Sequence, residues 1–405
     1  MKSSIDIFRL TTLAGFSRAI IGIVGFFQIQ IVITQYGLTE YGKIAALLSI
    51  APIGLILESG MSWGLRFKIA KMHDESEIRK LTLQAFRRNF VAVLFLNSIL
   101  SVFFILNATS FFGACCLTLM FSLLSVAFVP WIRCLEGTQN QYKILLAQLI
   151  SSLLGLLTLI LVGKNGNFLL LTIIFMSVGV VSGLLSSVQV IMAKPLFRNA
   201  SVYLDHNDQD PSFSSFHSIV IAICGTLLFS AHPMFIYFLE GSTASAKYGI
   251  QIRVLSIFIG VLSVLATQMQ VGFFRSRTRF AFQGPSMFRL FLASLFGGTL
   301  YLVVVSAANS ILLDKTFLDI DSLDLSYSLL VILSILQIPF STRDLGINGI
   351  RWQANSLFKV CVAALMIIFI FPVFRPEFVW VINLLYCLLF VAPLMFKTFR
   401  ESKTS

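Results

Sequence analysis

The chain has 405 residues, of which 57% are hydrophobic and 12% are charged, and its formal net charge is +12 at pH 7. Soluble proteins carry about a quarter charged residues, so this composition excludes an ordinary soluble domain and predicts an integral membrane protein. In a membrane protein the positive charge indicates first how the helices are oriented across the membrane, and we expect no nucleic-acid partner. The six cysteines lie in apolar runs or at their ends, without metal-ligand spacing to histidine, so we expect no metal site, no cofactor and no disulfide.

Apolar runs long enough to cross a bilayer recur along the whole chain. The first, 10–35, is followed by no small-residue cleavage site, so we interpret it as a membrane helix and not as a signal peptide. The basic, amphipathic segment 61–72 is expected to lie against the inner leaflet. The pattern predicts an all-α polytopic fold of about twelve transmembrane helices, at roughly 10–35, 42–60, 89–108, 110–132, 143–163, 168–192, 215–239, 249–272, 288–312, 326–342, 355–374 and 377–396.

The distribution of the 30 lysines and arginines orients these helices. With the N-terminus in the cytoplasm, most of them fall in cytoplasmic segments or at inner helix ends. Two fall within spans, Arg18 and Arg253, and the external side holds few: Lys43, Lys164, Lys247, Lys315 and Arg375. This bias obeys the positive-inside rule and predicts that both termini are cytoplasmic. Part of the positive charge is then available to anionic membrane lipids.

A repeated segment divides the predicted helices into two halves. TEYGKIAALLSI, residues 39–50, aligns without a gap with AKYGIQIRVLSI, residues 246–257, and both copies lie at the external start of the second helix of a six-helix half. An even number of spans gives the two halves the same orientation, related by an axis along the membrane normal. We therefore expect an N-terminal lobe at 1–193, a polar cytoplasmic linker at 194–213 and a C-terminal lobe at 214–405, which is a transporter architecture.

Arg18 and Arg253 are the clearest functional candidates, because a charge inside a span costs about 2.5 to 3.5 kcal/mol unless it faces water or a partner. Each lies on a polar stripe at helical spacing, Arg18 with Gln28 and Arg253 with three others, Ser256, Thr267 and Gln270. We expect both arginines to bind an anionic head group, since guanidinium matches phosphate in bidentate fashion, and the other four residues to line the path. Helix packing through the small residues of the stripes, with arginines that reach the membrane surface, is the alternative.

Three further ionisable residues are candidates for ion coupling or gating. Glu58 lies near the inner end of the second span, at a depth similar to that of Arg18, where it either pairs with Arg18 or marks the membrane surface. His217 and His232 lie on one side of the seventh span, and histidine titrates near physiological pH. Packed neutral histidines are the alternative interpretation. Pro233, directly after His232, predicts a kink in this helix.

The run GLTEYGKIAALLSI, followed by Glu58, Gly60, Arg66 and Ala70, resembles the "G-x-x-x-Y-G … acidic-x-G … R-x-x-x-A" signature of polysaccharide exporters of the multidrug/oligosaccharidyl-lipid/polysaccharide (MOP) superfamily, and in particular Wzx-type O-antigen flippases. The resemblance implies two six-helix lobes that move an undecaprenyl-pyrophosphate-linked oligosaccharide to the outer leaflet of a bacterial inner membrane. Coupling to H+ or Na+ is implied as well. Cationic cavity residues would bind the pyrophosphate, and we expect polysaccharide polymerase machinery as a partner.

Two other functions stay open. A drug or cation exporter of the MATE type shares the expected fold, but it would need a carboxylate in the cavity to attract cations, whereas the clearest charges within spans are arginines. A membrane enzyme such as an O-antigen polymerase or ligase would need catalytic residues on a large external loop. The longest predicted external loop, residues 315–325, is short and acidic, and the chain has no nucleophile motif or phosphate-binding glycine loop, so we expect a transporter and not an enzyme.

Overall fold

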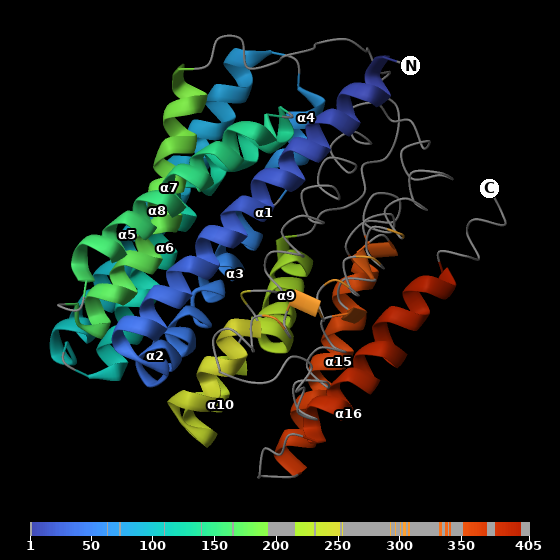
Figure 1. The fold of residues 1–405 in the computed structure, drawn as a ribbon. Coiled ribbons are helices and arrows are strands. Elements are labelled where there is room, and N and C mark those ends of the chain that lie inside the picture. The colour runs from blue at the N-terminus through green and yellow to red at the C-terminus, as the bar shows by residue number, and fades with distance from the viewer. Residues whose placement is uncertain are drawn as a thin grey trace. The chain divides into compact units, whose positions relative to one another are not determined.

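The computed structural model describes residues 2–62, 64–72, 74–108, 110–138, 140–163, 166–192, 215–230, 232–251, 351–370 and 377–397, together with Arg253 and isolated positions between 292 and 341. Regular secondary structure in these segments is entirely helical (Figure 1). Seven of the described helical segments are long and apolar enough to cross a membrane. They correspond in order to the first seven predicted spans, and most of the eighth to tenth predicted spans lies outside the described residues.

The first half of the chain begins with α1 (Lys2–Tyr36), which is followed by Gly37 with a φ of 89°. The predicted second span is two helices, α2 (Leu38–Leu48) and α3 (Pro52–Met61), which together form one candidate crossing, Leu38–Ser59. Pro52 explains the interruption, because proline has no N–H to continue a helix but fits the first turn of a new one. The short helix α4 (Leu65–Lys71) follows.

Four long helices complete this half: α5 (Glu75–Leu106), α6 (Phe111–Gly137), α7 (Gln141–Val162) and α8 (Phe168–Met192). Asp74 caps α5 by accepting a hydrogen bond from the Ser76 N–H at 2.8 Å, and Ser110 caps α6 by accepting one from the Gly113 N–H at 3.1 Å. At 32 residues, α5 is about 48 Å long at 1.5 Å per residue, so it extends well beyond a bilayer core of about 30 Å.

The seventh predicted span is interrupted, as Pro233 led us to expect. It consists of α9 (Ser215–Gly225), a π-helical turn η2 (Thr226–Ser230) and α10 (His232–Glu240). After Gly241, whose φ is 91°, residues 242–251 form another helix. Near the C-terminus lie α15 (Arg351–Ile370) and α16 (Glu377–Tyr386), and α16 continues through a second π-helical turn, η4 (Cys387–Val391), into a helix that reaches residue 397.

The chain divides into two compact units, 1–202 with 229–253 and 203–228 with 254–405. In the first unit α5, α6, α7 and α8 pack side by side and α1 packs on α7, while in the second unit α9 and α16 pack on α15. The predicted lobes at 1–193 and 214–405 stay a prediction. The first unit differs from the predicted N-terminal lobe by including residues 194–202 and 229–253.

Apolar side chains cover much of the outer surface of the first unit. Leucine, isoleucine, valine and phenylalanine on α5 and α7 are half or more exposed, among them Val91, Phe95, Ile105, Leu106 and Leu161. Polar residues lie inside instead: Asn89 is fully buried, and its Nδ2 donates to Ser62 Oγ at 2.8 Å. Apolar outside and polar inside is the arrangement that a bilayer requires, since lipid cannot satisfy hydrogen-bonding groups. The predicted all-helical, multi-pass membrane fold is therefore confirmed.

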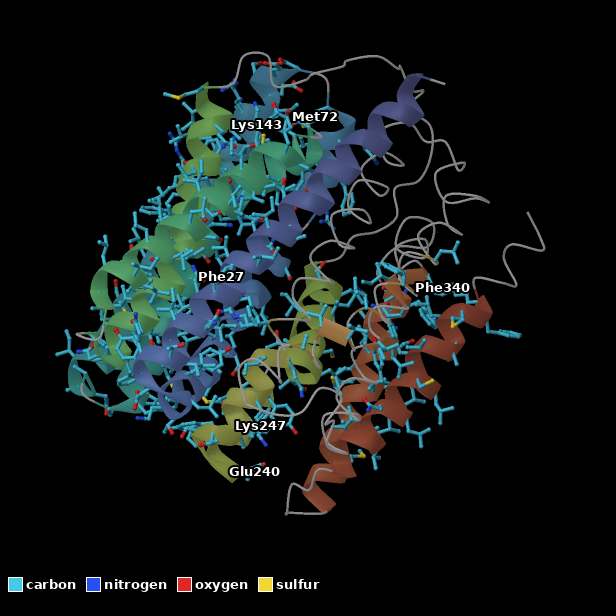
Figure 2. All side chains as sticks on the ribbon, in the orientation of Figure 1. Phe27, Met72, Lys143, Glu240, Lys247 and Phe340 are labelled. Atoms are coloured by element: carbon cyan, nitrogen blue, oxygen red, sulfur yellow. The ribbon has the colours of Figure 1, made fainter. Side chains whose placement is uncertain are left out.

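Figure 2 labels residues near two opposite ends of the first unit. Met72 and Lys143 lie at one end of this unit, and Glu240 and Lys247 lie at the opposite end. The sequence assigns Lys143 to the cytoplasmic side and Lys247 to the external side, so the separation agrees with the predicted topology. We call these the predicted cytoplasmic and external ends below.

Candidate functional site

Four charged residues meet inside the first unit, near its predicted cytoplasmic end, and we call them the arginine–glutamate cluster: Glu58, Arg66, Arg133 and Glu136. The Arg133 guanidinium donates to both carboxylates, with 2.9 Å from Nε to Glu58 Oε1 and 2.7 Å from Nη1 to Glu136 Oε2. Arg66 Nη1 lies 3.5 Å from Glu136 Oε2. The Glu58 side chain is only 3% exposed. The cluster joins α3, α4 and α6, and its two carboxylates face two guanidinium groups.

Glu58 therefore has a partner that sequence reasoning did not identify. The expected alternatives were a pair with Arg18 or a position at the membrane surface, whereas its Oε1 accepts a hydrogen bond from Nε of Arg133 and forms an ion pair with Nη2 of the same residue. The i,i+3 spacing of Arg133 and Glu136 in α6 was a signal for their own pair. Nothing in the sequence connects either residue with Glu58, which lies 75 positions earlier.

Helix α4 is buried, although the sequence led us to expect a surface helix. Leu65, Arg66, Phe67, Ile69 and Ala70 are buried, and α4 packs on α6. The prediction that it lies against the inner leaflet is wrong. The helix can be buried because Glu136 pairs with Arg66. Burial lowers the pKa of Arg66 to about 10, against the raising effect of Glu136, so the guanidinium remains protonated at neutral pH.

The contact between α4 and α6 depends on Gly137. A Cβ at this position would lie 2.7 Å from the carbonyl oxygen of Arg66 and 2.7 Å from Cγ2 of Ile69. We expect Gly137→Ala to lower the free energy of unfolding by about 1–3 kcal/mol, the usual cost of overpacking a close contact. Thermal unfolding of the purified protein in detergent measures this. Gly179→Ala on α8, whose Cβ would meet Ser125 Cβ at an ordinary 3.5 Å, is the control and should not lower the free energy of unfolding, because alanine favours helix over glycine.

Arg18, the first predicted binding residue, lies on α1 in the same unit. Its Nε is buried and has no hydrogen-bond partner among the described residues, and the guanidinium is attracted electrostatically by Glu136. Both carboxylates of the cluster already bind its two arginines. Together with Arg18 there are three arginines and two glutamates, so one positive charge is left without a carboxylate. A buried donor without a partner is costly, and an anion would satisfy it.

Arg253, the second predicted binding residue, is the last residue of the first unit. Its guanidinium carbon lies 5.8 Å from the centroid of the Phe175 ring on α8, in a cation–π arrangement, and the charge interacts electrostatically with the Tyr41 hydroxyl on α2. Phe175 and Tyr41 are both buried. Sequence reasoning did not identify Phe175, because an aromatic residue in an apolar span carries no signal that separates a cation partner from a packing residue.

The two copies of the repeated segment are in direct contact, which the sequence did not predict. α10, Gly241 and the 242–251 helix form a hairpin, which we call the 232–251 hairpin, and it packs on α2. A Cβ on Gly42 would overlap the carbonyl oxygen of Ser242, and a Cβ on Gly249 would overlap Cβ of Ala45. The buried hydroxyl of Ser245 lies 3.1 Å from the carbonyl oxygen of Gly42 and 2.8 Å from that of Pro233. Small residues at helical spacing are what such close crossings require.

An aromatic contact extends this crossing to α6. The Phe111 ring stacks on the Tyr237 ring of α10, with 4.5 Å between centroids and 14° between planes, and meets the Phe238 ring edge-on. Aromatic pairs of this kind contribute about 0.5–1.5 kcal/mol beyond the area they bury. The 232–251 hairpin is thus held to the first unit through both of its helices.

The remaining predicted site residues are placed as follows. Gln28 on α1 is buried, and its Nε2 donates to the Ser152 carbonyl of α7 at 3.0 Å, so it joins two helices. His217 on α9 has a buried Nδ1 without a hydrogen-bond partner among the described residues. His232 begins α10. Three predicted lining residues lie outside the described residues: Ser256, Thr267 and Gln270. The roles assigned to all of these residues stay predictions.

Structural comparison identifies transporters with this fold. The MATE multidrug transporter DinF-BH, solved in complex with a bound compound, matches with a TM-score of 0.68 over 97% of this chain and 95% of its own, at 10% identity. A MATE protein in complex with MaL6 matches with a TM-score of 0.61 over 98% and 97%, at 12% identity. A MOP superfamily transporter from Pyrococcus furiosus matches with a TM-score of 0.52 over 96% of this chain and 95% of its own, at 14% identity. It is described as having a binding pocket of reverse polarity that suggests a different function.

No protein-family model and no curated protein sequence matches this chain. Because the structural neighbours share so few residues with it, their similarity establishes the fold alone. The chain has the fold of MATE transporters along almost its whole length, and a topology of about twelve transmembrane helices agrees with that fold.

Proposed function

We propose that this protein is a flippase that moves an undecaprenyl-pyrophosphate-linked oligosaccharide, an O-antigen repeat unit, from the cytoplasmic to the periplasmic leaflet of a bacterial inner membrane. The observation that carries the proposal is the positive charge of Arg18, which lies near the arginine–glutamate cluster without a carboxylate of its own. Both carboxylates of the arginine–glutamate cluster pair with arginines, and the buried Nε of Arg18 has no hydrogen-bond partner among the described residues. This charge favours an anionic cargo.

The physical problem explains why such a site is needed. A sugar head group with a pyrophosphate cannot cross hydrocarbon, because each unsatisfied polar group costs several kcal/mol. The lipid tail needs no help and can remain in the bilayer. A cleft between the two predicted lobes, 1–193 and 214–405, would shield the head group while the lobes rock to expose it on alternate sides. The linker 194–213 would connect the lobes.

Each predicted residue has a role in this proposal. Arg18 would meet the pyrophosphate near the cytoplasmic side, and Arg253 would meet it nearer the external side. The path would be lined by Gln28, Ser256, Thr267 and Gln270. The histidines His217 and His232 would couple the cycle to a gradient of H+ or Na+. The ion pair with Arg133 favours a structural role for Glu58 over a coupling role.

A MATE-type exporter of drugs or cations is the second candidate. Its support is the shared fold, since two of the structural neighbours are MATE proteins solved with bound compounds. A fold does not determine a cargo, however, and the neighbour from Pyrococcus furiosus is described as having a pocket of reverse polarity. The two buried carboxylates of the arginine–glutamate cluster, Glu58 and Glu136, both pair with arginines, which favours the anionic cargo.

Deletion of the gene separates the two functions. For a flippase, we expect lipid-linked repeat units to accumulate on the cytoplasmic face of the inner membrane and surface polysaccharide to be lost. Accessibility of the lipid-linked sugar to an external enzyme, in intact and in permeabilised spheroplasts, measures the face. Normal surface polysaccharide with increased drug sensitivity would instead establish MATE-type export, and the wild-type gene on a plasmid is the control for either result.

A further inference from the structure

The 232–251 hairpin packs closely within the first unit, and it is flanked along the chain by segments of the second unit. Its contact with α2 is very close, because Gly42 and Gly249 leave no room for a Cβ, and the Ser245 hydroxyl lies within hydrogen-bond distance of carbonyl oxygens on both sides of the crossing. Yet its sequence neighbours on both sides, 203–228 and 254–405, belong to the second unit. The hairpin is thus packed with one unit and covalently continuous with the other.

The regular α-helix is interrupted just before the hairpin begins. The boundary between the units falls between Leu228 and Phe229, inside the π-helical turn Thr226–Ser230. Pro233 follows, and it has no N–H with which to continue the backbone ladder. π-Helical turns and prolines are common sites of helix bending, and π-helical turns are frequent at functional sites. The backbone can therefore pivot here at little cost in hydrogen bonds.

We propose that the 232–251 hairpin is the external gate of the transport path, hinged at Thr226–Ser230 and closed by the crossing of the two repeated segments. This inference rests on the proposed function only in assuming that the protein opens to each side in turn. The crossing lies at the predicted external end, near Glu240 and Lys247 (Figure 2), so cargo leaves on that side only when the glycine contacts separate. Arg253 is four residues beyond Gly249, and it lies against Phe175 when the gate is closed.

Pulsed electron–electron distance measurements test the gate without any assumption about the cargo. Spin labels at Thr39→Cys and Thr243→Cys, both exposed and each in the first turn of its helix, report the separation of α2 and the hairpin. The native cysteines are first replaced, since Cys115 is partly exposed. For the full chain in nanodiscs we expect a short and a second, longer distance. A single short distance in every condition, including all variants below, would overturn the gate and make the hairpin a permanent part of the first unit.

Gly42→Ala supplies the matched perturbation. Alanine favours helix over glycine, so α2 itself is not weakened, but the new methyl group would overlap the Ser242 carbonyl oxygen. We expect the closed-to-open ratio to fall roughly tenfold or more, as an overpacking penalty at the closed contact implies. Gly64→Ala, where a Cβ meets nothing within 4 Å, is the control and should leave the distances unchanged. Equal behaviour of the two variants would contradict the proposal.

A reversible cross-link then connects the gate with transport. Phe111→Cys and Tyr237→Cys replace the stacked rings, and a short bis-methanethiosulfonate reagent ties α6 to α10. We expect transport to stop on cross-linking and to return with dithiothreitol, whereas each single variant with the same reagent remains active. Full transport in the cross-linked protein would overturn the gate. If the spin labels separate but deletion of the gene leaves surface polysaccharide normal, the flippase assignment fails and the gate stands.

Discussion

Arg133→Met is expected to destabilise the first unit by about 3–5 kcal/mol, the usual result of removing one partner from a buried ion pair. Arg133 donates to both Glu58 and Glu136, and the Glu58 side chain is only 3% exposed, so its loss leaves a carboxylate buried without a cation. Methionine keeps most of the volume, which separates the charge effect from a cavity. Thermal unfolding in detergent and the yield of folded protein are the measurements.

Two further variants make this prediction specific. Arg87→Met removes an exposed arginine of α5 and should leave the transition within the range of ordinary surface substitutions, about 0.5 kcal/mol. The double variant Arg133→Met with Glu58→Gln should recover part of the loss, because the unpaired carboxylate is then neutral. If Arg133→Met unfolds at the temperature of Arg87→Met, the cluster does not hold α3 and α6 together.

Arg18→Ala and Arg253→Ala should each lower transport of the lipid-linked oligosaccharide roughly tenfold or more, because a charge-assisted hydrogen bond contributes about 1.5–3 kcal/mol. Arg18→Lys and Arg253→Lys should retain part of the activity, since lysine keeps the charge but loses the bidentate geometry. Surface polysaccharide at matched protein levels is the measurement.

The control for the arginine variants is Arg87→Ala, since Arg87 is exposed at the cytoplasmic extension of α5. It should transport normally. Thermal unfolding of every variant separates a lost binding contact from a misfolded protein, because a binding residue changes transport without a matching loss of stability. Full activity in both alanine variants would refute the cationic path.

The helices could be predicted from the sequence because the bilayer imposes a simple requirement on it. About 20 apolar residues must follow one another, and the first seven predicted spans correspond to the seven helical segments that are long and apolar enough to cross a membrane. The errors lie at the ends. α5 begins at Glu75, well before the predicted 89, because a helix with polar residues continues beyond the membrane. The second span is broken before Pro52, which a count of apolar residues does not detect.

The partners of the polar residues were far less predictable. The basic segment around α4 reads as a surface helix, yet it is buried because Glu136, on α6, pairs with Arg66. Glu58 could be recognised as unusual, but its partner Arg133 is separated from it by 75 positions. A pattern within one helix gives the side on which a charge lies. It does not give which helix is packed against that side.

The sequence by itself determined that this is a multi-pass helical membrane protein and that residues 39–50 are repeated at 246–257. It also predicted which ends of the helices are cytoplasmic. These properties are local, since each depends on composition or on a match between short segments. Only the tertiary structure decided that Gly42 and Gly249 make the two copies cross closely and that both glutamates of the cluster are bound by arginines. The physical reason is that close packing and charge pairing join residues distant in the chain, and their energies depend on distances that no single segment specifies.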